Sequence, residues 1–209
     1  MTDEQMQSVK DDIAFMRALA AEGQRTPMLG GAIMAAAGVI FALASVAFWA
    51  LTQGILRLDP NWGSMIIWMG ALAIFLIVLT IINLRIGKKP GASSPTNKAT
   101  GAAWTGVGIS IFAMGVSYGF AGWKLQSEDV MVTFPSVIFA LYGAGWAVAS
   151  AMTGKKWLWY VALGSWAVAP VLAYFAGDAA QYLAYAAALL LLMALPGAIL
   201  LRQEPSDIV

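Results

Sequence analysis

Few residues of this chain carry side chains suited to chemistry, and their types and spacing point away from catalysis. The sequence has no Cys and no His, so it offers no thiolate nucleophile, no imidazole base and no His ligand for zinc or haem. Gly177-Asp178 is half of the paired-aspartate signature of intramembrane aspartyl proteases, but no second Asp lies in a hydrophobic segment. Ser165 has no His to activate it. We therefore expect no catalytic residue, no metal site and no cofactor.

Four of the polar aromatic residues within hydrophobic stretches are the candidates for binding: Tyr118, Tyr142, Trp146 and Trp166. Such side chains bury a large apolar area while seeking one hydrogen bond. We expect them to fill space opposite glycines. The alternative is that they line a pocket for a neutral or aromatic ligand, or for a lipid.

The composition of the chain indicates which kind of secondary structure carries these aromatic residues. Of 209 residues, 60% are hydrophobic and 11% are charged, and the mean hydropathy is +0.75. Soluble domains carry roughly 25% charged residues. The chain is therefore expected to be an integral membrane protein in contact with the lipid bilayer. The formal net charge of +1 argues against a nucleic-acid partner, and the lack of Cys excludes a disulfide scaffold.

Six stretches free of Asp, Glu, Lys and Arg are long enough to cross a hydrocarbon core of about 30 Å. They are Met28–Leu51, Gly63–Leu84, Gly101–Trp123, Val130–Met152, Trp157–Ala176 and Ala179–Leu201. Apolarity all round each segment favours helices over barrel strands. The predicted fold is an all-α membrane protein: a cytoplasmic amphipathic helix in residues 1–25, a six-transmembrane bundle in 26–201, and a cytoplasmic tail in 202–209.

Local signals mark the ends of the spans. Thr26 before Pro27 predicts a helix start, and Asn61 and Asp178 are candidate caps for the second and sixth spans. Gly154 predicts a helix stop. Six tryptophans lie near span ends, as in two interfacial aromatic belts: Trp49, Trp62, Trp123, Trp104, Trp157 and Trp159.

Lys and Arg residues in the connections predict the orientation. One side holds ten: Lys10, Arg17, Arg25, Arg85, Lys88, Lys89, Lys98, Lys155, Lys156 and Arg202. The other side holds only Arg57 and Lys124. Because cytoplasmic loops carry the excess of positive charge, both termini are expected in the cytoplasm and the protein in an inner (plasma) membrane. The polar segment before the first span is too long for a cleavable signal peptide.

The N-terminal segment has the pattern of an amphipathic helix. Its apolar face repeats at alternating three- and four-residue spacing: Met6, Val9, Ile13, Met16 and Ala20. Asp3, Glu4, Asp11 and Asp12 make the opposite face acidic. One interpretation is a helix lying on the membrane or on the bundle. The other is a helix that docks a partner protein or a second copy, because membrane-surface helices usually carry Lys and Arg instead.

Glycines repeat every seven residues in two spans. The third span has Gly101, Gly108, Gly115 and Gly122, and the first has Gly31 and Gly38, continued by Ser45. Small residues let helix backbones approach closely in a membrane, where lipid supplies no hydrophobic drive for association. We expect these glycines to pack within one bundle, or to form the interface of a homo-oligomer or of a larger membrane complex.

Six spans in about 200 residues resemble the substrate-binding components of energy-coupling-factor vitamin transporters, and Ala32 and Ala36 have the spacing of that family's Ala-xxx-Ala contact motif. The resemblance covers topology only and assigns no site. The residues themselves favour a non-enzymatic structural, assembly or regulatory protein that associates through its glycines and its N-terminal helix. The alternative is a channel or carrier for a small uncharged solute or lipid.

Overall fold

The structure is a computed structural model that describes residues 5–14, 27–89, 91–127 and 129–204, without the side chains of residues 60 and 61. Six of its helices are long and apolar enough to cross a membrane. The spans are α2 (Gly31–Thr52), α3 (Pro60–Ile86), α4 (Pro95–Leu125), the short 3₁₀ helix η1 (Met131–Thr133) with α5 (Phe134–Thr153), α6 (Lys156–Tyr174), and α7 (Ala180–Leu189) continued by η2 (Leu190–Ala194) and α8 (Leu195–Leu201). The predicted helical membrane bundle is thus present.

Several helix starts differ from the predicted ones. α2 begins at Gly31, with Gly30 as its cap, so Pro27 lies before the helix; Thr26 is outside the described residues. α4 begins at Pro95 rather than Gly101, because Ser94 accepts a hydrogen bond from the Asn97 amide at 3.2 Å and a charged residue does not stop a helix.

The two other predicted start signals are also displaced. α3 starts at Pro60, and the amides of Trp62 and Gly63 donate to the Asp59 carbonyl, so Asn61 lies inside the helix. The cap of α7 is Ala179 rather than Asp178. The predicted stop at Gly154 is confirmed: it follows α5 with φ +68°, a left-handed conformation that glycine adopts without strain.

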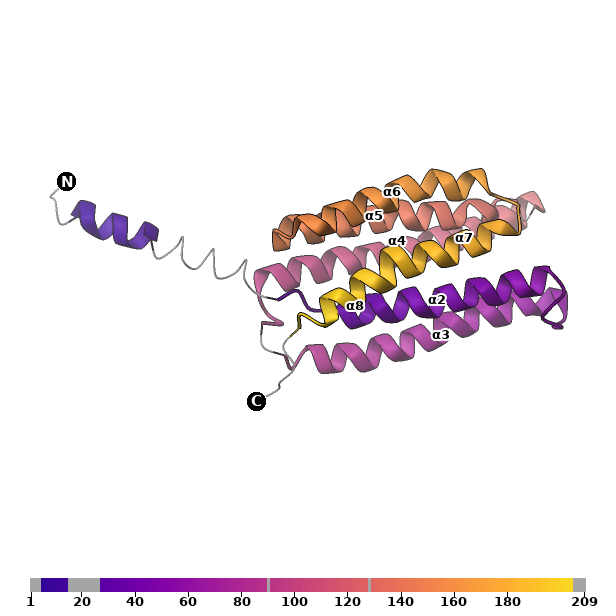
Figure 1. Ribbon diagram of the computed structural model, residues 1–209, viewed down its shortest axis with the longest axis horizontal. Helices are drawn as coiled ribbons and strands as arrows, with labels where there is room; N and C mark the ends of the chain where they lie inside the picture. Colours follow the sequence, from indigo (N-terminus) through magenta and orange to yellow (C-terminus); the bar gives the residue numbers. More distant parts are fainter. Residues whose placement is uncertain (1–4, 15–26, 90, 128, 205–209) are drawn as a thin grey trace.

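The helices lie side by side in two groups (Figure 1). In one group α2 lies between α3 and the span made of α7, η2 and α8; in the other, α5 contacts α4 and α6. The least buried helices are α3 and α4, whose most apolar windows are only 6% and 11% buried, against 50% for the last span. These two helices therefore offer the largest surfaces to lipid or to another protein.

The backbones of α2 and the last span are in direct contact. A Cβ atom on Gly31 would lie 2.4 Å from the amide nitrogen of Leu201, and one on Gly38 would lie 2.4 Å from that of Ala194. From the other side, a Cβ on Gly197 would lie 2.4 Å from the Ala35 nitrogen. Further along, the Ser45 hydroxyl donates to the Tyr182 carbonyl at 2.7 Å. Only hydrogen fits at these three glycines.

The N-terminal segment is helical over residues 5–14. Met6, Val9 and Ile13, three of the five residues of the predicted apolar face, are exposed. Met16 and Ala20 lie outside the described residues. The longer amphipathic helix stays a prediction.

Candidate functional site

An aromatic cluster joins the two groups of helices inside the bundle. Trp146 is fully buried, and its ring centre lies 5.0 Å from that of Trp104, in an edge-to-face arrangement. Tyr142 lies 6.0 Å from Trp104 and 5.6 Å from Phe139, and Phe139 in turn contacts Tyr185 of α7 at 5.8 Å. Edge-to-face pairs at these distances stabilise beyond their buried area. The cluster brings α4, α5 and α7 together.

The structure places two of the four candidate aromatics in this cluster, Tyr142 and Trp146. Tyr118 lies apart, with its ring 5.6 Å from Phe134. Trp166 covers Gly143, donates from Nε1 to the Ala140 carbonyl at 3.1 Å, and is 37% exposed. The four residues therefore do not line one pocket.

Sequence reasoning missed Trp104 as a member of the cluster. It was expected at the membrane interface because it lies near a span end, but α4 begins earlier than predicted and carries Trp104 further into the bundle. Thr96, Thr100 and Val107 of the same helix are buried, so residues spaced three or four apart around Trp104 mark the inward face of α4. Their burial depends on how α4 packs against α5, so the sequence alone carried no signal for Trp104.

Trp146 also provides a hydrogen bond that the last span needs. Pro196 has no amide hydrogen, so the carbonyl of Leu192, four residues earlier, lacks its usual helical donor. Trp146 Nε1 donates to this carbonyl at 3.0 Å. The same stretch, Leu190–Ala194, is wound as a π-helix, an irregularity that is rare and concentrated at functional positions. The break in the last span thus coincides with the aromatic cluster.

Two polar atoms of α4, one in the aromatic cluster and one a helical turn away, have no hydrogen-bond partner in the described part of the chain. Among the described residues, the buried side-chain atoms without a hydrogen bond are Thr100 Oγ1 and Trp104 Nε1. A buried polar group left unpaired costs about 1–3 kcal/mol. These neighbouring groups of α4 are therefore available to a water or a small polar molecule.

At the end of the bundle opposite the start of α2, a buried glutamine ties three elements together. Gln181 is 1% exposed, and its Nε2 donates to the carbonyl of Val132 at 2.6 Å and to that of Leu172 at 3.0 Å. This joins η1, α6 and α7. The side-chain amide of Gln181 thus holds these three elements together through its two hydrogen bonds.

The glycines of α4 have a different environment from those of α2. A Cβ on Gly101 or Gly108 would meet no atom within 4 Å. A Cβ on Gly115 would lie 3.3 Å from the Phe134 ring, and one on Gly122 would lie 3.1 Å from the Ser127 carbonyl oxygen. Gly119, also open, joins Val116, Phe120 and Trp123 around a shallow apolar groove. The first half of the α4 stripe is therefore an uncovered surface.

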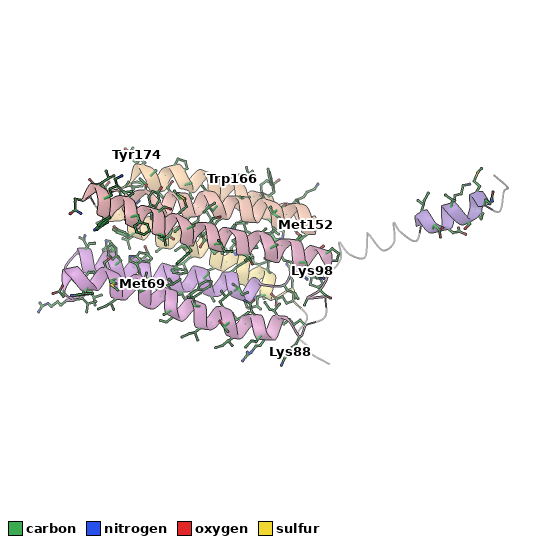
Figure 2. All side chains as sticks on the ribbon, turned by 180° about the vertical axis from the view of Figure 1, so that it is seen from behind. Met69, Lys88, Lys98, Met152, Trp166 and Tyr174 are labelled. Carbon is green, nitrogen blue, oxygen red and sulfur yellow. The ribbon has the colours of Figure 1, made fainter. Side chains whose placement is uncertain are left out.

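Within the described residues, no group of three or more His, Cys, Asp or Glu side chains lies close enough to hold a metal ion. Figure 2 shows Lys88 and Lys98 at the same end of the bundle, and Tyr174 at the opposite end.

These features define a multi-pass helical membrane protein. No protein family matches the chain, and no characterised protein or solved structure is significantly similar to it.

Proposed function

We propose that this protein is a non-enzymatic membrane protein with a structural, assembly or regulatory role, which associates with a second copy or with helices of a larger complex. The observation that carries the proposal is the contrast between the two glycine stripes. Gly31 and Gly38 lie directly against a neighbouring backbone, whereas a Cβ on Gly101 or Gly108 would meet no atom, on a helix that is little buried.

The physics of helix association in lipid supports this role. Lipid tails are as apolar as leucine, so membrane helices associate through close packing at small residues. Each glycine in a helix costs about 1 kcal/mol relative to alanine. A backbone approaching Gly101 and Gly108 would offset that cost, and a seven-residue repeat suits a left-handed crossing of about 20°. The N-terminal helix would supply a second contact outside the membrane.

The test compares two equally open glycine positions on α4. Gly108→Leu should leave the bundle folded, because a Cβ there meets no atom of the chain, and should weaken association by at least about tenfold. Gly106→Leu is the matched control: it is also open but lies about 160° around the helix from Gly108. Association is measured by native mass spectrometry and by energy transfer between labelled copies in liposomes.

Equal association of Gly108→Leu and the unsubstituted protein would contradict the glycine interface. Deleting residues 2–22 should also weaken association. A protein that is monomeric, without a stable partner and unaffected by that deletion, would refute the proposal as a whole.

A second candidate function is a channel or carrier for a small uncharged solute, supported by the two unpaired polar atoms beside the aromatic cluster. Trp104→Phe removes one of these donors and keeps a ring. It should reduce solute flux in proteoliposomes, whereas Trp166→Phe should not, because the Trp166 N–H is already bonded to Ala140. Flux that is the same in both variants would argue against this site.

A further inference from the structure

A buried carboxylate lies at the terminal end of the bundle, which we define as the end where α2 begins and α8 ends. Its side chain, that of Glu204, is 2% exposed. Glu204 Oε1 accepts hydrogen bonds from the amides of Gly30 at 3.0 Å and Gly31 at 2.9 Å. Its Oε2 lies 2.6 Å from Nζ of Lys89. One carboxylate therefore joins the end of the chain, the start of α2 and the α3–α4 connection.

The start of α2 has no local group that could do this. The cap residue is Gly30, which has no side chain and a left-handed φ of +107°, and the first turn contains no acidic residue. The first amides of a helix lack partners within the helix, and they carry its partial positive charge. Glu204 satisfies two of them from a position far along the sequence.

Within the part of the chain that the structure describes, the hydrogen-bond and ion-pair partners of the Glu204 carboxylate all belong to this contact. It follows the C-terminus of α8, the end of a helix that disfavours negative charge. Its favourable partners, the two amides and Lys89, come from α2 and the α3–α4 connection. They are within reach because Gly31 lets the α8 backbone lie against α2. The carboxylate contact and the closed α2–α8 packing therefore depend on each other.

Neighbouring side chains extend the contact to the other connections. Asn97 Oδ1 accepts from the Leu29 amide at 2.9 Å, and Asn97 Nδ2 donates to the carbonyls of Pro27 and Gly91, both at 3.0 Å. Lys155, in the α5–α6 connection, donates to the side chain of Gln203, and burial lowers the pKa of this lysine. Asn97 thus joins the start of α4 to the segment before α2 and to the α3–α4 connection. Lys155 joins the α5–α6 connection to the segment after α8.

From this geometry we infer that Glu204 is a latch. When its carboxylate occupies the start of α2, residues 27–30 and 202–204 are held against the bundle. When it leaves, the amides and Lys89 bind water, and the terminal end opens between α2 and α8. Both terminal segments are then released together. The latch is independent of the α4 surface, and it controls when residues 27–30 and 202–204 become accessible.

The absence of native Cys allows a direct test. Met28→Cys places a thiol in the held segment, at a residue that is 1% exposed, so maleimide should label it slowly in nanodiscs. Adding Glu204→Ala should raise the labelling rate by about tenfold or more, because it removes three charge-assisted contacts. Lys88→Ala, which removes the exposed neighbour of Lys89, is the matched control and should change nothing.

A second reporter separates local opening from unfolding. Leu172 is 1% exposed and lies near the opposite end of the bundle, so a Leu172→Cys thiol should stay protected when Glu204→Ala is added. An unchanged labelling rate at Met28→Cys would overturn the latch. An equal rise at both reporters would also overturn it, because the carboxylate would then hold the whole fold rather than one end.

Exchanging the charges tests the role of the helix start. In the double variant Glu204→Lys with Lys89→Glu, an ordinary ion pair could re-form, but the amides of Gly30 and Gly31 would face a cation. We expect the end to stay as open as with Glu204→Ala. Full recovery of the protection of the Met28→Cys thiol would contradict the latch, because an ion pair between residues 89 and 204 would then be sufficient without the amides of α2.

Discussion

The indole of Trp146 shows how one polar atom is accommodated in an apolar bundle. Pro196 deprives the Leu192 carbonyl of a helical donor, and in lipid no water is present to replace it. Trp146 Nε1 supplies the hydrogen bond, while its ring fills the space between the two groups of helices. The proline and the tryptophan therefore act as a pair, although they lie far apart in the sequence.

This pairing predicts a specific coupling. Trp146→Phe should lower the free energy of unfolding by about 1–3 kcal/mol, because a buried carbonyl loses its partner and the ring is smaller. In a Pro196→Ala background the loss should be smaller, since an alanine at that position would return a helical amide to the Leu192 carbonyl. The measurement is a double-mutant cycle of unfolding in mild detergent. Strictly additive effects of the two substitutions would show that they are not coupled.

At the scale of helices, the same seven-residue glycine pattern has two outcomes. In α2 the glycines meet the backbone of the last span, whereas in α4 the first two meet no atom of the chain. Both helices begin at the terminal end, and both stripes allow close approach. The difference is which neighbour the tertiary fold brings to each helix.

Gly38→Ala should therefore destabilise the fold. A Cβ there would lie 2.4 Å from the Ala194 nitrogen, so α2 and η2 must separate, at a cost of about 1–3 kcal/mol or more. Gly108→Ala, with nothing within 4 Å, serves as the control and should leave the melting temperature unchanged or higher. Thermal unfolding of the two purified variants makes the comparison. Equal melting temperatures of the two variants would mean that α2 and the last span can separate enough to accommodate a methyl group at residue 38 without loss of stability.

At the scale of the whole molecule, the start of α2, the α3–α4 and α5–α6 connections and the end of α8 lie together at the terminal end. That is the end which the Lys and Arg count predicts to be cytoplasmic. The opposite end holds the α2–α3 loop and the α6–α7 turn.

The predicted orientation can be measured with single cysteines. Asp178→Cys, at an exposed turn of the opposite end, should react with a membrane-impermeant maleimide in intact cells. Lys88→Cys, exposed at the terminal end, should react only after the membrane is permeabilised. The unsubstituted chain, which has no Cys, gives the background. The reverse pattern would place the termini outside.

Much of the fold follows from local sequence. Long uncharged segments must be helical in lipid because only a helix satisfies its own backbone, so all six spans could be predicted. Gly154 could be predicted to end a helix because few other residues adopt its left-handed conformation. Exact helix starts were less accessible, since Gly30 begins α2 with help from Glu204 rather than from an adjacent cap.

The spans, the grouping of charge at the ends and the residues able to pack closely can be predicted without the structure, because these depend on composition and on helical spacing. Three features emerge from the packing of the helices: Gly31 and Gly38 are covered whereas Gly101 and Gly108 are open, Trp104 rather than Trp166 contacts Trp146, and Glu204 reaches α2. Each of these is a contact between distant segments. Such contacts depend on how whole helices pack, which local spacing does not encode.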